Sequence, residues 1–271
     1  MKRLNALLIL SLLFLSTAFA QQSFIGGWQL GKIGISFGGD QDMIRDLNHS
    51  YLLSTIDGPT VHDYSNLNFE EGDLSSMVCD NTHTRLTMAF TPPSVRNTEI
   101  RMSIVHIGDR VDAVSFNGYD DEGAQRNLHF NLYSSEIAFE AVALKRASVG
   151  RRLHFYGGMG TNTGYSYDNE LEVYGDNLTM MPDGNLQFRV AGDTPMNDVG
   201  NIDSYAQSYQ ASNAIHQRLF LQAGIGVSLF KALELNFDIR KGIGYRMHKG
   251  ADCQATRMNS SSLGLYWYVF R

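Results

Sequence analysis

Charged residues recur inside apolar segments of this sequence at even spacings. Glu234, Asp238 and Arg240 do so between Leu233 and Met247, where Leu, Phe and Ile fill the alternate positions. Residues two apart point to the same face of a β-strand, so these charges gather on one face. Ionisable groups gathered in this way either line a path for ions or pair with one another. We predict a set of inward-facing charges: Arg101, Arg152, Arg218, Glu234, Asp238, Arg240 and Arg246.

Three histidines, His83, His129 and His154, lie on the polar side of other alternating segments. Imidazole is the commonest metal ligand, so two or three of these rings could bind a metal if they met. None of them has a second ligand two or four residues away, a spacing that a local metal site would show. We therefore predict no metal and no other cofactor.

Ser134, Ser135 and Glu136, together with His129, supply the residue types of an acyl-transfer site. Such a site needs a nucleophilic hydroxyl, a base in contact with it and an acid that orients the base. The spacing here matches no motif of that kind. We predict no catalytic residue and no enzyme activity, and we keep hydrolysis of a membrane lipid as an alternative.

The chain contains two cysteines, Cys79 and Cys253. They are too far apart in the sequence for a local zinc site. An exported protein meets an oxidising compartment, where two cysteines are able to bridge. The sequence allows a Cys79–Cys253 disulfide and two free thiols alike.

The elements that position these residues are long β-strands. From Leu233 to Met247, apolar and polar residues alternate without interruption. A strand of a soluble protein usually runs for about five or six residues, whereas a strand that crosses a bilayer needs roughly nine to eleven. The alternation therefore indicates a membrane-crossing strand with one lipid-facing and one inward-facing side.

Eight segments of the chain show this pattern, with Gly and Ser frequent on the polar side. Small residues on that side suit a narrow barrel filled with side chains. A filled barrel favours an internal network of salt bridges over an ion path for the charged set. The predicted strands cover residues 26–38, 82–91, 98–117, 127–146, 151–165, 216–230, 232–247 and 255–270.

The pattern slips in places. Leu128, Phe130 and Leu132 have the opposite parity to Ile137 and Phe139, and a β-bulge near residues 134–135 would keep all five on one face. Another slip follows residue 30. A turn at residues 108–109 would divide one long strand in two, which leaves ten strands as an alternative to eight.

The connections between the predicted strands alternate in length. Short links follow the second, fourth and sixth strands, whereas two of the others are very long, at 39–81 and 166–215. An outer-membrane barrel has short periplasmic turns and long extracellular loops, so both cysteines fall at the extracellular end. Within the long loops, we expect a short helix in 41–55 and a hairpin of 171–174 with 186–190.

The first twenty residues form an export signal. A basic start, an apolar stretch from Leu7 to Phe14 and the small residues Ala18 and Ala20 match a cleavable signal peptide, which leaves 21–271 as one barrel domain. No later stretch is apolar for long enough to be a transmembrane helix. The net charge of −6 argues against a nucleic-acid partner, which needs a basic face.

Aromatic residues cluster at the predicted periplasmic rim, at Trp28, Phe230, Trp267 and Phe270. Aromatic side chains favour bilayer interfaces because a large apolar body carries a polar tip in Trp and Tyr. A soluble two-layer sheet also alternates, but it does not need such long strands. In hydrocarbon the sheet must close, because each unpaired backbone group at an open edge costs several kcal/mol.

With these strands and its closing segment Leu263–Arg271, the sequence resembles the small outer-membrane β-barrel superfamily, which includes eight-stranded, porin-like barrels. The resemblance implies an all-β, closed antiparallel transmembrane barrel in the outer membrane, with lipid, the barrel-assembly machinery and an extracellular ligand or protein as partners. Members commonly end in an aromatic residue, whereas here Phe270 precedes Arg271. The resemblance implies a structural or surface-binding role; the alternatives are a narrow porin-like channel and a lipid A hydrolase.

Overall fold

The computed structural model describes residues 27–44, 49–59, 79–119, 125–176, 178–180, 186–188 and 204–269. The predicted signal peptide and Phe270 lie outside these residues. Most of the described chain belongs to eight long strands: β1 (Gln29–Ile44), β2 (Cys79–Thr91), β3 (Thr98–Tyr119), β4 (Gln125–Val149), β5 (Leu153–Asp176), β9 (Ala214–Phe230), β10 (Leu233–His248) and β11 (Gln254–Tyr268). Shorter elements are α2 (His49–Ser54), β6 (Leu178–Met180), β7 (Leu186–Phe188) and β8 (Ser204–Gln210).

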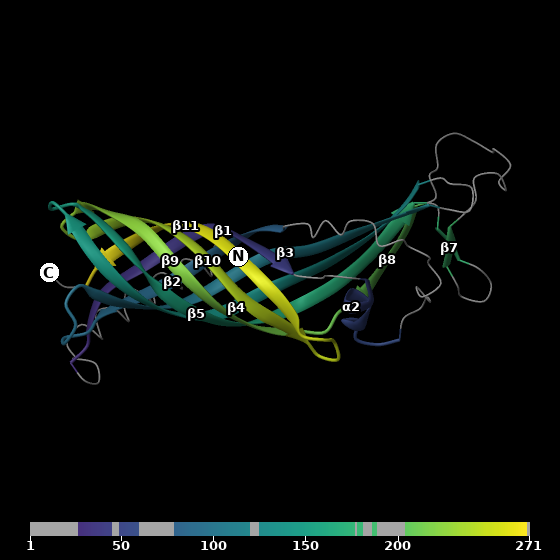
Figure 1. Ribbon diagram of the computed structural model, residues 1–271, viewed down its shortest axis with the longest axis horizontal. Helices are drawn as coiled ribbons and strands as arrows, with labels where there is room; N and C mark the ends of the chain where they lie inside the picture. The colour runs from purple at the N-terminus through teal and green to yellow at the C-terminus, as the bar shows by residue number, and fades with distance from the viewer. Residues whose placement is uncertain are drawn as a thin grey trace, which may run out of the picture.

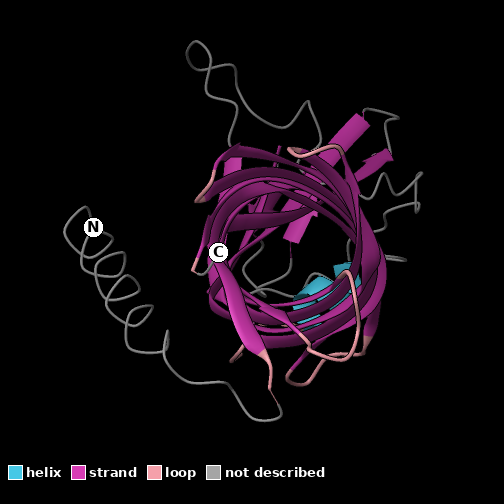
Figure 2. Cartoon of the chain, turned by 90° about the vertical axis from the view of Figure 1, so that its left-hand side faces the viewer, coloured by secondary structure: helices cyan, strands magenta, loops and turns pink. Residues whose placement is uncertain are grey.

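The eight long strands form a closed antiparallel ring (Figure 2). Each is hydrogen-bonded to its neighbours in the order β4-β3-β2-β1-β11-β10-β9-β5, and the pairing of β4 with β5 closes the circle. The eight strands lie where they were predicted, but β1 and β5 continue to Ile44 and Asp176, past their predicted ends at 38 and 165. The ten-stranded alternative is wrong, because β3 continues through Gly108 without a turn.

The two ends of the ring differ as predicted. At one end, short turns join β2 to β3, β4 to β5 and β9 to β10. At the other end lie α2, β8 and β7, beyond the ring (Figure 1). We call these the turn end and the loop end. Strands β3, β4 and β5 are the longest and extend furthest at the loop end.

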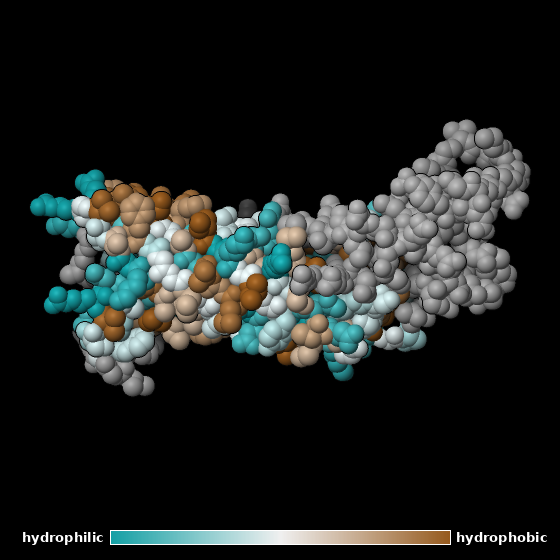
Figure 3. Space-filling view, viewed as in Figure 1, coloured by the Kyte–Doolittle hydropathy of each residue, from teal (hydrophilic) through white to brown (hydrophobic). Residues whose placement is uncertain are grey.

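Apolar side chains point outward over much of the ring. Phe37 and Leu263 are more than half exposed, whereas their neighbours Ser36 and Ser262 are buried inside. On the face shown in Figure 3, apolar residues gather near the turn end and polar residues increase towards the loop end. A soluble protein does not expose so continuous an apolar surface, so the ring is a transmembrane barrel and not a two-layer sandwich. Within the described residues, no helix is long and apolar enough to cross a membrane.

Near Ser134, the apolar residues of β4 change from the outward face to the inward face. Between Ser134 and the turn end, Ile137 and Phe139 face outward, whereas towards the loop end Leu128 and Phe130 are buried inside the ring. Even-numbered residues of β4 point inward on both sides of Ser134, so the prediction that these four share one face is wrong. Apolar residues turn inward because the wall beyond Ser134 has left the lipid and encloses an apolar core of its own.

Bulges flank this point in the two neighbouring strands. On β3, Gly108 and Asp109 face one residue of β4, and on β5 the register shifts between Tyr167 and Glu170. Asp168 has a φ of 52°, which places the β5 bulge partly in the left-handed region. The predicted irregularity near residues 134–135 is thus present, but the extra residues belong to β3 and β5.

A small apolar core closes the ring at its loop end. Tyr51 and Leu52 of α2 pack with buried residues of β4, β5 and β8. The helix predicted in 41–55 is confirmed over His49–Ser54. The predicted hairpin is wrong: residues 171–174 continue β5 and pair with β8, and it is β6 that pairs with β7.

Candidate functional site

The interior of the barrel is filled with ionisable side chains. Six of the seven residues predicted to point inward are buried there: Arg101, Arg218, Glu234, Asp238, Arg240 and Arg246. Arg152 does not join them, and this prediction is wrong. It lies exposed in the turn between β4 and β5, just before the first residue of β5.

The layer nearest the turn end is built on Glu99 and Glu234. Lys32 Nζ donates to Glu99 Oε2 at 2.8 Å and to Glu234 Oε1 at 3.0 Å. Arg101 also donates to Glu99, at 2.7 Å, and Arg146 donates to Glu234 Oε2 at 2.5 Å. These side chains come from β1, β3, β4 and β10, so the layer connects strands around the whole ring.

The middle layer is held by Glu140 and Asp238. Arg240 Nη1 donates to Glu140 Oε2 at 2.6 Å, and Arg85 Nε lies 3.3 Å from Glu140 Oε1. Asp238 accepts hydrogen bonds from Tyr156 at 2.7 Å and from Gln222 at 2.6 Å. Both carboxylates are therefore compensated by donors from other strands of the ring.

The layer nearest the loop end surrounds Asp42 and Glu136. Arg110 and Arg218 each donate to Asp42 Oδ2 at 2.6 Å. Arg218 also donates to Glu136 at 3.2 Å, and Arg246 pairs with both Glu136 and Asp112. Three arginines thus share three carboxylates at the height of the bulges.

Positive and negative charges balance inside the barrel. The cations are Lys32, Arg85, Arg101, Arg110, Arg146, Arg218, Arg240 and Arg246, and the anions are Asp40, Asp42, Glu99, Asp112, Glu136, Glu140, Glu234 and Asp238. An uncompensated charge in this low-dielectric interior would be costly. The sequence prediction missed most of the anions, although their position on the polar side of each strand was a usable signal.

Above the ion pairs, α2 and its surroundings cap the barrel. His248 Nδ1 lies 2.8 Å from the carbonyl oxygen of Ser212. Since a carbonyl oxygen only accepts hydrogen bonds, Nδ1 carries the proton and donates. Its ring lies edge-on to Tyr51 of α2, with centroids 6.0 Å apart. Burial raises the pKa of Tyr51 to about 12. The phenol is therefore neutral over the physiological pH range, which suits a buried position.

The residues proposed for other chemistry are not brought together. His83 faces Asp40 at 3.1 Å inside the ring, and His154 faces Glu234 at 3.1 Å. His129 lies on the outside of β4 and bonds to Ser115 at 2.7 Å. No cluster of three or more metal-ligating side chains occurs in the described part of the chain.

The residues considered for a lipid A hydrolase are not brought together either. Ser134 and Glu136 are buried inside the ring, whereas Ser135 and His129 point outward on the same strand. A nucleophile and its base must lie within hydrogen-bond reach, and these residues are divided between two faces.

The remaining predicted residues fall at the two ends of the barrel. Trp28, Phe230 and Trp267 are exposed at the turn end. Cys253 lies at the loop end as an exposed thiol, and the side chain of Cys79, its partner in the predicted disulfide, lies outside the described residues. Sequence analysis missed an aromatic group near the loop end of the apolar belt, where Tyr165 and Tyr245 point outward.

Comparison with known proteins finds matches among solved structures alone. No protein-family model matches the sequence, and no curated protein matches it. Among solved structures, Neisserial surface protein A is 10% identical, with 89% of this chain and 98% of that chain covered and a TM-score of 0.35. The outer membrane protein OprG from Pseudomonas aeruginosa is 9% identical, with 89% and 96% covered and a TM-score of 0.39. Ail, the attachment invasion locus protein of Yersinia pestis, is 12% identical, with 89% and 99% covered and a TM-score of 0.30.

The closed ring, its apolar belt and its unequal ends decide the architecture. This chain has the fold of an outer-membrane β-barrel. The ring closes through the β4–β5 pairing, so no sheet edge faces lipid. The barrel is narrow, and its inside holds side chains from every one of its strands.

Proposed function

We propose that this chain is a non-conducting barrel of the outer membrane that presents its loop end for binding at the cell surface. The observation that carries this proposal is the filled interior. Three layers of ion pairs and an apolar cap follow one another along the barrel, and their side chains are nearly all inaccessible to solvent. A water-filled path would require these charges to separate, which low-dielectric surroundings oppose.

The wall beyond the lipid belt supplies the proposed contact surface. Its outer face carries aromatic and polar side chains, among them Tyr133, Glu172 and Tyr174. His129 stacks on Tyr174 with ring centroids 4.8 Å apart, so part of this face is already ordered. Tyrosine-rich, preorganised surfaces bind partners at low entropic cost.

Conductance measurement tests the proposal against the porin-like alternative. The refolded full-length mature protein is inserted into planar bilayers, and a general porin inserted in the same membranes serves as the positive control. We expect no single-channel steps at any voltage that the membrane withstands. Reproducible steps from heat-modifiable, folded protein would refute a non-conducting barrel.

A variant with a disrupted middle layer provides a matched comparison. Replacing Arg85, Glu140 and Arg240 together by alanine removes two cations and the anion between them. Because this layer blocks the lumen, the folded triple variant should conduct weakly where the wild type is silent. Equal currents from both proteins would show that the middle layer does not close the barrel.

A further inference from the structure

A groove of about 970 Å³ runs across the outer, lipid-facing surface of the barrel. It follows one row of neighbouring residues from strand to strand: Ile100 on β3, Ala143 on β4, Met159 on β5, Leu221 on β9, Lys241 on β10 and Asn259 on β11. Its floor is the strand backbone over inward-pointing residues, among them Gly160 and Gly242. Ala141 and Ala143 add only methyl groups on the outer side, whereas the exposed side chains of Met159 and Leu219 stand at its edges.

The groove slopes across the bilayer towards the turn end. Strands of such a barrel tilt by about 35–45° from its axis, so a row perpendicular to the strands climbs in one direction. The row climbs towards β11, because β10 and β11 meet it near their middles whereas β3 meets it at Ile100, close to the turn end. Its upper end therefore lies in the outer leaflet, and its lower end, at Ile100, lies near the turn end.

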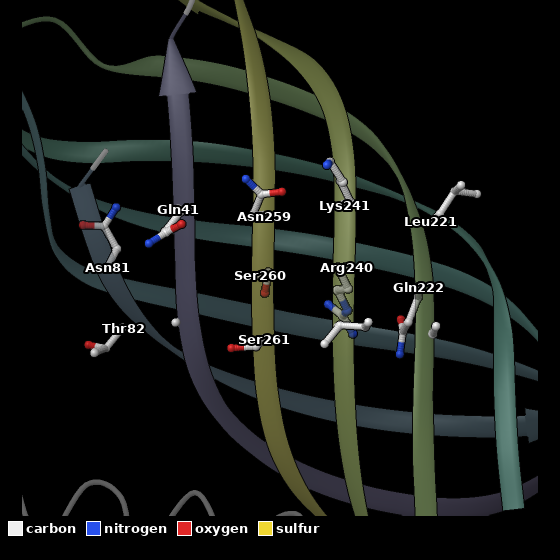
Figure 4. Close-up of a pocket in the computed structure, with 13 residues that line it drawn as sticks. Gln41, Asn81, Thr82, Leu221, Gln222, Arg240, Lys241, Asn259, Ser260 and Ser261 are labelled. Atoms are coloured by element: carbon white, nitrogen blue, oxygen red, sulfur yellow. The ribbon is translucent and has the colours of Figure 1, made fainter. Parts of the chain in front are cut away.

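The two ends of the groove differ in chemistry. Ile100, Ala143 and Met159 make the lower part apolar, whereas Lys241, Arg257 and Asn259 lie at the upper part. A second hollow, of about 760 Å³, continues from there over Gln41, Thr82 and Ser261. Figure 4 shows Gln41, Asn259 and Lys241 side by side on neighbouring strands.

This polar area interrupts an otherwise apolar belt. On β4, just above the groove, the outward-facing Ile137 and Phe139 are apolar. Lys241 lies between the outward-facing Ile239 and Ile243, which are 51% and 67% exposed. A cation on the lipid face of a barrel is destabilising, most of all near the midplane. An anion bound to Lys241 would offset this cost.

The height of Lys241 suits a lipid headgroup. The residue lies eight positions above Leu233, the first residue of β10. With a rise of about 3.3 Å per residue and a tilt of about 40°, this places its backbone roughly 20 Å above the turn end. The apolar belt of such barrels is about 25 Å tall, so the lysine side chain reaches the outer interface by extending upward. Arg257 pairs in register with Ile243, two residues higher on β10.

Neither cation has an acidic partner in the described part of the chain. Within the described residues, Lys241 and Arg257 form no ion pair, although the cations inside the barrel are all paired. Phosphate is the anion of membrane lipids that lies at this depth, and Arg and Lys bind it through charge-assisted hydrogen bonds. The groove below provides an apolar surface for a chain attached to that headgroup.

We propose that this groove is a specific site for one phosphorylated, acylated lipid of the outer leaflet. Its phosphate binds Lys241 and Arg257, Asn259 donates to its polar linkage, and one acyl chain lies along Leu221, Met159 and Ala143 towards Ile100. The site is separate from the loop-end surface, so its existence does not depend on whether the barrel binds partners or conducts.

Lipid binding to the full-length mature barrel tests this proposal. Native mass spectrometry of the folded protein in detergent compares diphosphoryl lipid A with the same lipid after removal of its phosphates. We expect one phosphorylated lipid to remain bound at concentrations where the dephosphorylated lipid is lost. Lys241→Gln combined with Arg257→Gln should weaken the phosphorylated complex about tenfold, since two charge-assisted contacts are removed.

Two matched variants separate a specific site from general attraction. Arg151→Gln with Arg152→Gln removes the same charge from the exposed turn between β4 and β5, and should leave binding unchanged. Ala143→Phe fills the groove and should weaken binding of the phosphorylated lipid, whereas Ala147→Phe adds the same bulk on the same strand outside the groove. Heat-modifiable mobility verifies that each variant folds.

Three results would overturn the proposal. Equal binding of the phosphorylated and dephosphorylated lipids would show only an annular layer. An equal loss of binding in the turn variant and the groove-end variant would show a general charge effect. Full binding by Ala143→Phe would exclude the acyl chain from the groove.

Discussion

Glu136 receives more cationic partners than any other carboxylate described inside the barrel. Arg110, Arg218 and Arg246 all lie within 3.5 Å of its oxygens, and His216 Nε2 lies 3.1 Å away. Sequence analysis considered this residue only as the acid of a hydrolase. Its actual surroundings could not be read from its neighbours in the sequence, because its partners come from β3, β9 and β10 and meet only when the ring is closed.

Replacing Glu136 by alanine should destabilise the barrel by about 3–5 kcal/mol, because buried arginines are then left without a counter-charge. Urea unfolding in micelles or vesicles, followed by tryptophan fluorescence, measures the change. Glu170→Ala is the control, since this carboxylate is exposed beyond the belt and bonds only to Ser208 among its described contacts. A similar loss in both variants would contradict a special importance of the buried network.

The stability of the docked α2 depends on the ionisation of Tyr51 at alkaline pH. Burial raises its pKa to about 12, from an ordinary value of about 10. The docked, neutral form is favoured below pH 10, so the docking of α2 loses stability as the pH rises from about 10 towards 12. Subtracting the tyrosinate absorbance titration of Tyr51→Phe from that of the wild type isolates this group. A midpoint near 10 in the difference curve would show that Tyr51 is not buried in solution.

At the scale of the element, the bulges fix where the wall leaves the lipid. Asp168 adopts a φ of 52°, a conformation in which a β-branched side chain is strained. Asp168→Val should cost about 1–3 kcal/mol of folding stability, and Asp168→Gly should be neutral or stabilising. Thr163→Val on the exposed face of the same strand is the control for adding a β-branched apolar side chain. Equal stability of the two valine variants would argue against a strained bulge.

Much of the element structure was predictable, and the exceptions share one cause. The alternation of β9, β10 and β11 assigned inward and outward faces correctly, because lipid touches one face along most of each strand. The same rule placed Leu128 and Phe130 outward, but an apolar residue beyond the bilayer is buried inside the wall instead. Period-two patterns report which residues share a face and not which face meets lipid.

Arg152 shows that parity alone also fails to place a residue at the end of a strand. It has the parity of the inward-facing residues of β5, yet the strand begins one residue later and the side chain reaches solvent. The ion pairs themselves were beyond sequence reasoning, since parity gives a face but not the partner across a closed ring.

At the scale of the whole molecule, the position of the bilayer follows from β4 alone. Phe139 and Asn131 both point outward, eight residues apart on opposite sides of the bulge level. Phe139→Arg should destabilise the folded barrel by about 2 kcal/mol in lipid vesicles, whereas Asn131→Arg should change its stability by well under half as much. Equilibrium unfolding in vesicles compares them. Equal costs would place both residues in the same environment and contradict the proposed boundary.

Many of the interior salt bridges join residues that are far apart in the chain. Asp42 on the first strand meets Arg218 on the sixth, and Lys32 meets Glu234 on the seventh. A sheet that had inserted only its early strands would carry these groups bare in a hydrocarbon environment. Intermediates with a partly built wall are therefore penalised, and the sixth and seventh strands complete many pairs together. Assembly of this protein is therefore a cooperative event.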